Sequence, residues 1–445
     1  MFGRRVDSPC AGLHALGSPP LTPLPYPNTD VRGGGRGREE RLEGGVDAPR
    51  AANGRHGATT LRGGLRGWFS CVEPEVLGLE SVPKDQSSLC PLAHMAAAPA
   101  VPALEYALRN AGDVDAIRDD LKELGVCVVK IYDENDPIVE SYEEGMAALA
   151  LELRPDRGTA HGARGMGGIV KTYAASCHPT AMSVRLDPRS RGVFAAVYGI
   201  PIEDTMVSWD AVGILGVDAQ RNDGAPRRVA DDPKKRFKAS TGSTLDPHVD
   251  VGLGSKGAAM QGKMKSLHPS FHACVQSQFV CRSVPPRGAT LVVSPGPWYS
   301  AEPDASLFDL GNHKDFCRIT ETGYRHLDGT WRAVEAPRGC LIMWISSLPH
   351  TNKFADAGVD PCRLVVFLAW QSRRLITDSE RACLKRKKRA MIFSGGTTDH
   401  WSTHIPKIHR GSHYSNRHPK TSVLYTSDNP PPYDEQLTLR IEEAM

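Results

Sequence analysis

The 445-residue sequence lacks any apolar run long enough to form a membrane-spanning helix. Its longest uninterrupted apolar stretch, residues 364–370, has seven residues, whereas a spanning helix needs about 20. The sequence also lacks a Cys-x-x-Cys pair, although it contains 11 cysteines. A membrane helix is therefore excluded, and neither a disulfide framework nor a four-cysteine zinc ribbon is indicated. This cysteine usage is typical of a protein from a reducing compartment.

A large excess of either charge is also missing, because 54 Lys and Arg face 51 Asp and Glu and the net charge is +3. Basic residues are concentrated in residues 373–420, with 12 Lys or Arg against 3 Asp or Glu. They include the run Lys385–Arg389, which we interpret as the exposed face of a helix. The alternatives are contact with phosphates, of coenzyme A or of nucleic acid, and a nuclear signal. A locally basic segment does not indicate a general nucleic-acid binder, so we expect no nucleic-acid partner.

Residues 1–94 contain little that could form a core, since 25 of them are Gly or Pro without a period. We predict a disordered extension over residues 1–94, one domain over residues 95–394 and a His- and Pro-rich tail over residues 395–445. Met95 resembles an initiator, so one hypothesis is that residues 1–94 are an extension of the gene model. The alternative is an organelle transit peptide, which the acidic residues of this segment oppose. We expect a cytoplasmic protein, or an imported one if residues 1–94 are translated.

Hydrophobic patterning predicts helices first and short strands later. Turn residues separate the expected strands, and this order favours a mainly β sandwich or barrel with flanking helices. Expected helices cover residues 113–124, 138–152, 184–199 and 376–393, and expected strands cover residues 126–131, 205–209, 273–281, 289–294, 339–345 and 363–370.

Four polar residues lie at the edges of the expected strands. His248 and Asp250 are two residues apart, which places them on one face of a strand, although such a pair alone is better explained as a surface His and Asp near a turn. His350 follows one apolar strand, and Arg363 begins another, where its charge needs a partner in a salt bridge or on a ligand carboxylate. The ordered set matches the 2-His-1-carboxylate triad of non-haem Fe(II) oxygenases. Such a triad leaves three positions open for a bidentate 2-oxo acid and O2.

The sequence resembles the phytanoyl-CoA dioxygenase-like family of Fe(II)/2-oxoglutarate oxygenases over roughly residues 113–402. One departure is Trp298, where the Pro-Gly turn of the family continues with Ser-His. The resemblance is specific for the superfamily and does not extend to coenzyme A ester substrates. Beyond the triad it rests on residues 121–130, 184–188, 206–210, 288–296, 338–344 and 397–401.

The resemblance implies a double-stranded β-helix, or cupin-like jelly roll, with helices outside it. It implies that His248, Asp250 and His350 bind Fe(II) and that Arg363 pairs with the far carboxylate of 2-oxoglutarate. Together with O2, these would hydroxylate a small organic substrate. The alternatives are a protein or nucleic-acid hydroxylase docked through the basic helix, and a non-catalytic jelly-roll module that binds a metal. No oligomeric state is indicated.

Several other polar residues have two interpretations. Gln276 alternates with apolar residues on an expected strand, so it either contacts the co-substrate from an inward face or lies on an outward polar face. Asn352 either helps to place the co-substrate or caps the turn after His350. Residues 252–257 match Gly-x-Gly-x-x-Gly, but no acidic residue follows at the spacing of a dinucleotide site, so we predict a mobile loop. We assign His400, within a sparse histidine cluster, to a surface loop.

Overall fold

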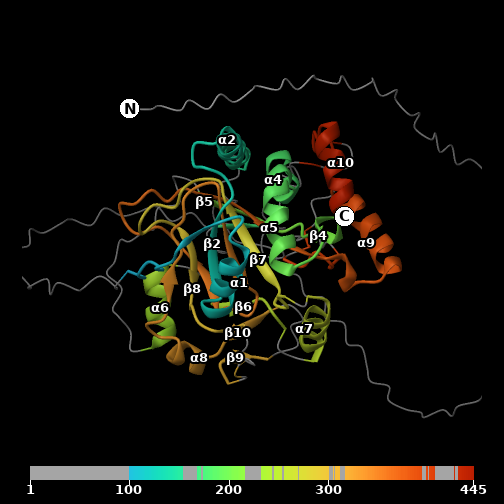
Figure 1. Cartoon of the computed structure of the whole chain (residues 1–445). Helices are drawn as coiled ribbons and strands as arrows, with labels where there is room; N and C mark the ends of the chain where they lie inside the picture. The colour runs from blue at the N-terminus through green and yellow to red at the C-terminus, as the bar shows by residue number, and fades with distance from the viewer. Residues whose placement is uncertain are drawn as a thin grey trace, which may run out of the picture. The chain divides into compact units, whose positions relative to one another are not determined.

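The described part of the chain, in this computed structural model, comprises residues 100–153, 168–171, 174–215, 232–242, 245–252, 255–268, 270–299, 304, 306–310, 316–392, 397–398, 400–405, 425 and 429–445 (Figure 1). All of them belong to one unit, Ser87–Met445. The predicted disordered extension, residues 1–94, lies outside the described residues. No helix among the described residues is long and apolar enough to cross a membrane.

The larger of two main sheets has seven strands in the order β1-β2-β12-β7-β14-β5-β3. Its central strands β12, β7 and β14 are antiparallel and buried along their whole length. Strands covered on both faces are expected to be mostly apolar, as β12 and β14 are. The strands are β1 (Leu108–Asn110), β2 (Val126–Lys130), β12 (Cys340–Ile345), β7 (Val275–Val280), β14 (Arg363–Leu368), β5 (Val212–Leu215) and β3 (Ile169–Val170).

The second sheet has six strands in the order β11-β8-β13-β6-β10-β9. Successive strands alternate between the sheets, since β12 and β14 belong to the first and β13 to the second. This winding makes the fold a double-stranded β-helix, or jelly roll, with flanking helices, and the predicted fold class is confirmed. The strands are β11 (Arg332–Ala333), β8 (Thr290–Val293), β13 (His350–Lys353), β6 (His248–Val249), β10 (Cys317–Ile319) and β9 (Phe308–Asp309), and a separate pair consists of β15 (Trp370–Ser372) and β4 (Thr205–Val207).

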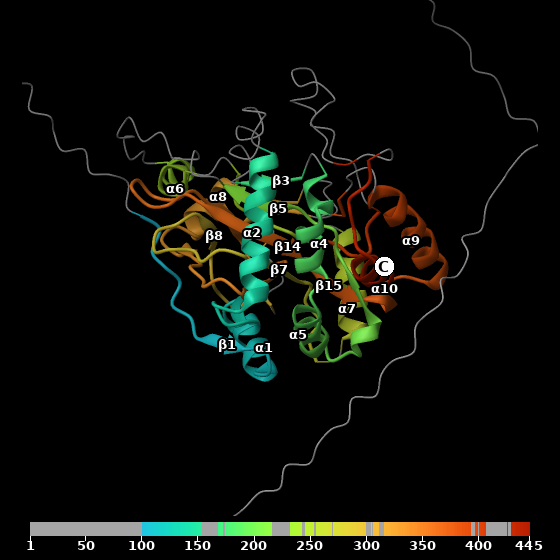
Figure 2. The ribbon, with the colours of Figure 1, turned by 90° about the horizontal axis from the view of Figure 1, so that it is seen from above.

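Helices cover the outer face of the seven-stranded sheet, and Figure 2 shows α2 and α4 lying over β7 and β14. Tyr142 of α2 packs edge-on against Phe279 of β7, with ring centroids 5.6 Å apart. The single helix predicted for residues 184–199 is wrong. One helix ends at Arg185, and Asp187 caps a second helix that begins at Pro188. The helices are α1 (Val114–Glu123), α2 (Pro137–Glu152), α4 (Pro179–Arg185) and α5 (Pro188–Tyr198).

The outer face of the six-stranded sheet carries α6 (Pro233–Thr241) and α8 (Glu321–His326), which contact each other. Phe237 and Tyr324 join them, with ring centroids 5.9 Å apart. The remaining helices are α7 (Ser255–Leu267), α9 (Asp378–Ile392) and α10 (Glu435–Ala444), with short 3-10 turns at Ala175–Cys177, Ile202–Asp204 and Arg373–Leu375. Because α7 begins at Ser255, the loop predicted for residues 252–257 is wrong at its C-terminal end.

The basic run of α9 is mostly occupied by contacts within the protein. Lys388 is fully buried and donates to the backbone oxygens of Val207 (2.9 Å) and Ser402 (2.8 Å). Lys385 and Arg389 form ion pairs with Glu442 of α10, and the two helices lie side by side in Figures 1 and 2. The interpretation of this run as an exposed face is therefore wrong for Lys388.

Candidate metal centre

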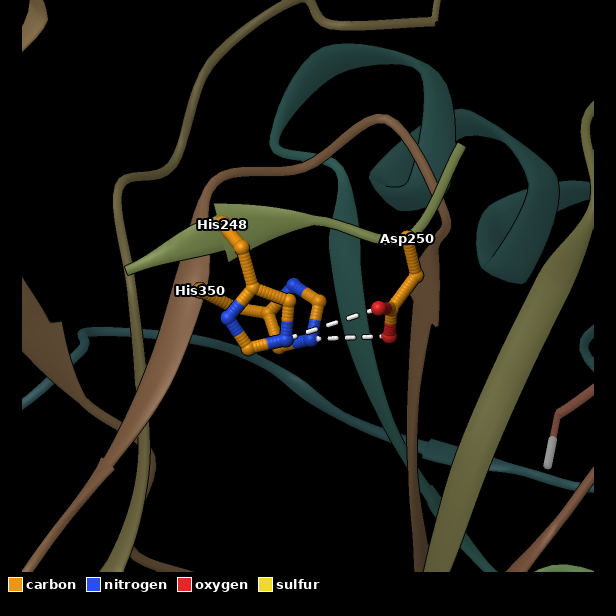
Figure 3. Close-up of side chains that lie close together, drawn as sticks. All are labelled: His248, Asp250 and His350. Atoms are coloured by element: carbon orange, nitrogen blue, oxygen red, sulfur yellow. Dashed lines mark ion pairs between the residues drawn. The ribbon is translucent and has the colours of Figure 1, made fainter. Parts of the chain in front are cut away.

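His248 and His350 meet because their strands pair side by side. In the β6–β13 ladder the two residues are direct cross-strand partners, and such partners project from the same face of a sheet. Their ring centroids are 4.6 Å apart. Asp250 follows two residues after His248, so the carboxylate points to the same side as both rings. Figure 3 shows the two rings side by side, with the carboxylate of Asp250 facing them.

The three side chains form a compact donor set. The Nε2 atom of His248 lies 3.4 Å from Oδ1 of Asp250, and that of His350 lies 3.1 Å from Oδ2 (Figure 3). All three ligand atoms lie within 4.8 Å of one another. Donor atoms bound about 2.1 Å from one metal and at right angles to each other are about 3 Å apart. The group formed by His248, Asp250 and His350 can therefore hold a metal ion.

Backbone carbonyls determine which nitrogen of each histidine is available. The Nδ1 atom of His248 lies 2.9 Å from the oxygen of Asp246, and that of His350 lies 2.9 Å from the oxygen of Leu348. A carbonyl only accepts, so each Nδ1 carries a proton, and in the neutral form of each ring the lone pair is therefore on Nε2. Histidine ligands are typically oriented by such a hydrogen bond at the second ring nitrogen. Both lone pairs thus face the carboxylate.

The charge states of the site suit metal binding. Burial lowers the pKa of His248 to about 4, so its imidazole is neutral at neutral pH. Burial would raise the pKa of Asp250, but His400, His248 and His350 around it hold that pKa well below its usual range. Metal ions bind neutral imidazole and ionised carboxylate. No proton therefore has to leave these two groups at neutral pH before a cation binds.

A polar patch on the inward face of the seven-stranded sheet lies opposite the donor set. Gln276 and Gln278 of β7 share that face with Trp344 of β12, whose ring centroid is 5.6 Å from that of His350. Arg363 is 1% exposed and donates from Nη2 to Oε1 of Gln278 at 2.6 Å. Burial lowers the pKa of Arg363 to about 9, which leaves it charged at neutral pH.

Three buried polar atoms on the facing sides of the sheets have no hydrogen-bond partner among the described residues. They are Nε2 of Gln278, Nε1 of Trp344 and Oδ1 of Asn352. Asn352 lies beside Leu291 of β8 on the face that carries His350. A buried polar atom without a partner costs about 1–3 kcal/mol, so such a group calls for an explanation by a bound molecule or water.

The two open interpretations of Gln276 and Asn352 are decided in part. Gln276 faces inward, but its amide donates to Oγ of Ser346 at 3.0 Å. Asn352 lies inside β13 and not in a turn, so the turn-cap interpretation is wrong. Contact of either residue with a co-substrate stays a prediction.

His400 lies next to Asp250, a position that the sequence interpretation did not predict. It is 7% exposed, so its assignment to a surface loop is wrong. Its Nε2 atom lies 3.1 Å from the backbone oxygen of Asp250, 150 residues away in the chain. The available signal was the motif of residues 397–401, in which Trp401 follows His400 directly. Trp401 is buried in the main core.

No family model and no curated protein sequence matches this chain. Solved structures that are similar to it include GlcNAc Inducible Gene 2 (DUF1479) from Candida albicans, with 10% identity, 76% of this chain and 79% of that chain covered, and a TM-score of 0.46. Another is the hypothetical protein JW0805 from Escherichia coli, with 11% identity, coverages of 66% and 78%, and a TM-score of 0.41. A third is the epimerase SnoN in complex with Fe3+, alpha ketoglutarate and nogalamycin RO, with 12% identity, coverages of 58% and 83%, and a TM-score of 0.36. At these identities and TM-scores the likeness carries no information on the activity of this chain.

Proposed function

We propose that this protein is a non-haem Fe(II)- and 2-oxoglutarate-dependent dioxygenase that hydroxylates a small organic substrate. The observation that carries the proposal is the donor set of His248, Asp250 and His350, in which both Nε2 lone pairs face one carboxylate. Two histidines and one carboxylate favour Fe(II) among the metals with this ligand set and leave open positions for other ligands. Within this class, we assign the chain to the phytanoyl-CoA dioxygenase-like group on its sequence motifs.

The inward polar patch fits a dicarboxylic co-substrate. Arg363 would pair with the far carboxylate of 2-oxoglutarate, because a guanidinium binds a carboxylate through two parallel hydrogen bonds. Gln278 already accepts from Arg363, and its Nε2 atom is left to donate. Nε1 of Trp344 is a second donor on the same face. An oxygen-rich ligand between the sheets would satisfy these donors.

In the proposed reaction, bound Fe(II) and 2-oxoglutarate supply the activation of O2 that oxidation of a C–H bond requires. The protein supplies position and environment. His248, Asp250 and His350 hold the metal on one side, and Arg363 sets the direction of the co-substrate. Trp344 covers the ring of His350 and helps to exclude water from the inter-sheet space.

The distribution of basic residues supports a small substrate over a nucleic acid. A docking helix needs several free cations, but in this run only Arg386 and Lys387 are exposed without an ion pair that the described residues show, since Lys388 is buried and Lys385 and Arg389 pair with Glu442. A non-catalytic module has no need of a buried arginine opposite its metal group. The buried position of Arg363 therefore supports an enzyme.

The test is succinate formation by the apoprotein reconstituted anaerobically with Fe(II), then supplied with 2-oxoglutarate and O2. We expect activity in the parent and none in His350→Ala or Asp250→Ala, because two remaining donors hold Fe(II) too weakly. His326→Ala, at an exposed position of α8, is the matched control and should keep full activity. Iron content of each protein is measured in parallel. Full activity and iron content in Asp250→Ala would overturn the proposal.

A further inference from the structure

Asp250 differs from the two histidines in how the fold holds it. His248 and His350 lie within paired strands and face each other across the ladder. Strand β6 ends at Val249, so Asp250 lies one residue beyond the strand. Its backbone nitrogen donates to the oxygen of Ser346 at 2.8 Å. A ligand beyond the end of a two-residue strand needs a further contact to fix its position.

His400 provides that contact. Its Nε2 atom lies 3.1 Å from the backbone oxygen of Asp250, so the imidazole donates a hydrogen bond there. Its Nδ1 atom is 3.8 Å from Oδ2 of the same residue, which is too long for a hydrogen bond. His400 therefore acts on the main chain of Asp250, which is held from one side by Ser346 and from the other by His400.

The chain on both sides of His400 is anchored to the jelly roll. Before it, Thr398 exchanges two hydrogen bonds with the backbone of Trp209, at 2.7 and 2.6 Å. After it, the backbone nitrogen and hydroxyl of Ser402 both donate to Oε1 of Gln371, at 3.0 and 2.8 Å. Lys388 adds a third anchor through the oxygen of Ser402. The ring of His400 is thus held in place by contacts that do not involve the metal ligands.

We propose that His400 is a positioning residue of the metal centre, which fixes the backbone of Asp250 so that its carboxylate meets the two histidines. This inference rests on the proposed function, because it takes the three residues to be metal ligands. It extends the centre to a part of the chain 150 residues beyond Asp250. The anchored segment, residues 397–398 and 400–405, becomes part of the site and not an appendage to it.

The test is titration of the metal-free protein with Co(II), a spectroscopic substitute for Fe(II), to measure its Kd and its d–d absorption bands. The variants His400→Gln and His400→Met have side chains of similar length, but only the glutamine can donate to the oxygen of Asp250. Loss of an outer hydrogen bond to a metal ligand typically weakens binding by about 10- to 100-fold. We expect a loss of this size, with altered d–d bands, in His400→Met. We expect affinity within a few-fold of the parent in His400→Gln.

Two controls separate the possible outcomes. Thr403→Val removes a hydroxyl of the same segment that has no partner among the described residues, and it should leave Co(II) affinity unchanged. His350→Ala should abolish binding, and unchanged affinity in that variant would overturn the proposed function itself. If His350→Ala does not bind Co(II) while folded His400→Met binds it as tightly as the parent, only the role of His400 is overturned. Should His400→Met not fold, as judged by circular dichroism, His400→Phe replaces it, and equal affinity of the Phe and Gln variants overturns the inference.

Discussion

Two backbone carbonyls, those of Asp246 and Leu348, determine the chemistry of the site histidines. Each carbonyl lies two residues before the histidine that it accepts from, so local chain geometry orients both rings. The Nε2 atoms of both rings are thereby directed towards the carboxylate of Asp250, where a metal ion could bind. Arg363 is separate from the candidate ligands, because it lies on the facing sheet and donates to Gln278 there.

Arg363→Ala should therefore raise the 2-oxoglutarate requirement while leaving Co(II) or Fe(II) affinity nearly intact. Removing one partner of a buried charge-assisted pair costs about 2–5 kcal/mol, which is about 30- to 5000-fold in affinity. Arg363→Lys should recover part of the loss, since an ammonium cannot form two parallel hydrogen bonds. The measurement is the 2-oxoglutarate concentration that gives half-maximal succinate formation.

Arg374→Ala is the matched control for this prediction. Arg374 is exposed and pairs with Asp204, so its loss should leave the co-substrate requirement unchanged. Circular dichroism and metal content establish that the Arg363 variants are folded. Equal 2-oxoglutarate binding in folded Arg363→Ala and in the parent would make Arg363 a structural residue.

His268 links burial to pH-dependent stability. Its ring stacks on Tyr198 with centroids 4.5 Å apart, and neither ring nitrogen has a partner among the described residues. Burial lowers its pKa from 6.5 to about 4. Between these values the unfolded chain binds a proton at this position and the folded chain does not. The contribution of His268 to the free energy of unfolding therefore decreases as the pH falls from 6.5 towards 4.

His268→Phe should weaken this pH dependence, because it keeps the stacked ring and removes the titrating nitrogens. At pH 7.5 it should also raise the free energy of unfolding by about 1 kcal/mol or more, since two unsatisfied polar atoms disappear. Urea unfolding at pH 7.5 and pH 5 measures both effects. His326→Phe, at an exposed position, should change neither. An unchanged pH dependence in His268→Phe would contradict the prediction.

Among the elements, the charged helix α9 connects two separate parts of the chain through one buried lysine. Its exposed positions include Arg386 and Lys387, while Lys388 points into the protein. Lys388 joins Val207 of β4 to Ser402 of the anchored segment through two backbone oxygens. Burial lowers its pKa to about 7, because the charged ammonium loses its contact with water. The helix thereby connects the segment that carries His400 to the β15–β4 pair.

Lys388→Met should destabilise the protein, because methionine fills the same space but leaves two buried carbonyls without a donor. The expected loss is about 1–3 kcal/mol in the free energy of unfolding. Chemical denaturation measures it, and limited proteolysis after residue 392 reports whether the anchored segment is loosened. Lys387→Met is the control, since Lys387 is exposed on the same helix. Equal stability of the two variants would show that the hydrogen bonds of Lys388 to Val207 and Ser402 do not stabilise the protein.

At the level of the whole molecule, the core extends to the C-terminus of the chain. Trp401, Leu437 and Ile441 are each at most 4% exposed and belong to the main core cluster. Helix α10 contacts α4 and β4. Residues after 394 therefore contribute to the same core as the two sheets.

Two truncations should accordingly have opposite effects. A chain that begins at Met95 keeps every described element. We therefore expect it to have the same melting temperature and the same Co(II) affinity as the full chain. A chain that ends at residue 394 loses Trp401, Leu437 and Ile441, and each such buried side chain contributes about 1.5–3 kcal/mol. Since a whole protein is stabilised by only about 5–15 kcal/mol, we expect this truncation to be largely unfolded. Thermal melts and Co(II) titration of both proteins provide the measurement, and a stable chain ending at 394 would contradict this view.

Local patterning was enough to predict β7, β12 and β14, but not β6 and β13, which carry His248 and His350. The grouping of His248, Asp250 and His350 was predicted from their order in the chain and from the family resemblance. Apolar runs bounded by turn residues mark β7, β12 and β14, and the two-residue period of a strand places His248 and Asp250 on one side. The positions of Lys388 and His400 depended on contacts with residues about 150 or more positions away, and neither residue type is expected to be buried. Only the tertiary structure could decide them, because a polar side chain is buried where the folded chain happens to supply a partner. Nothing in its neighbouring residues encodes that partner.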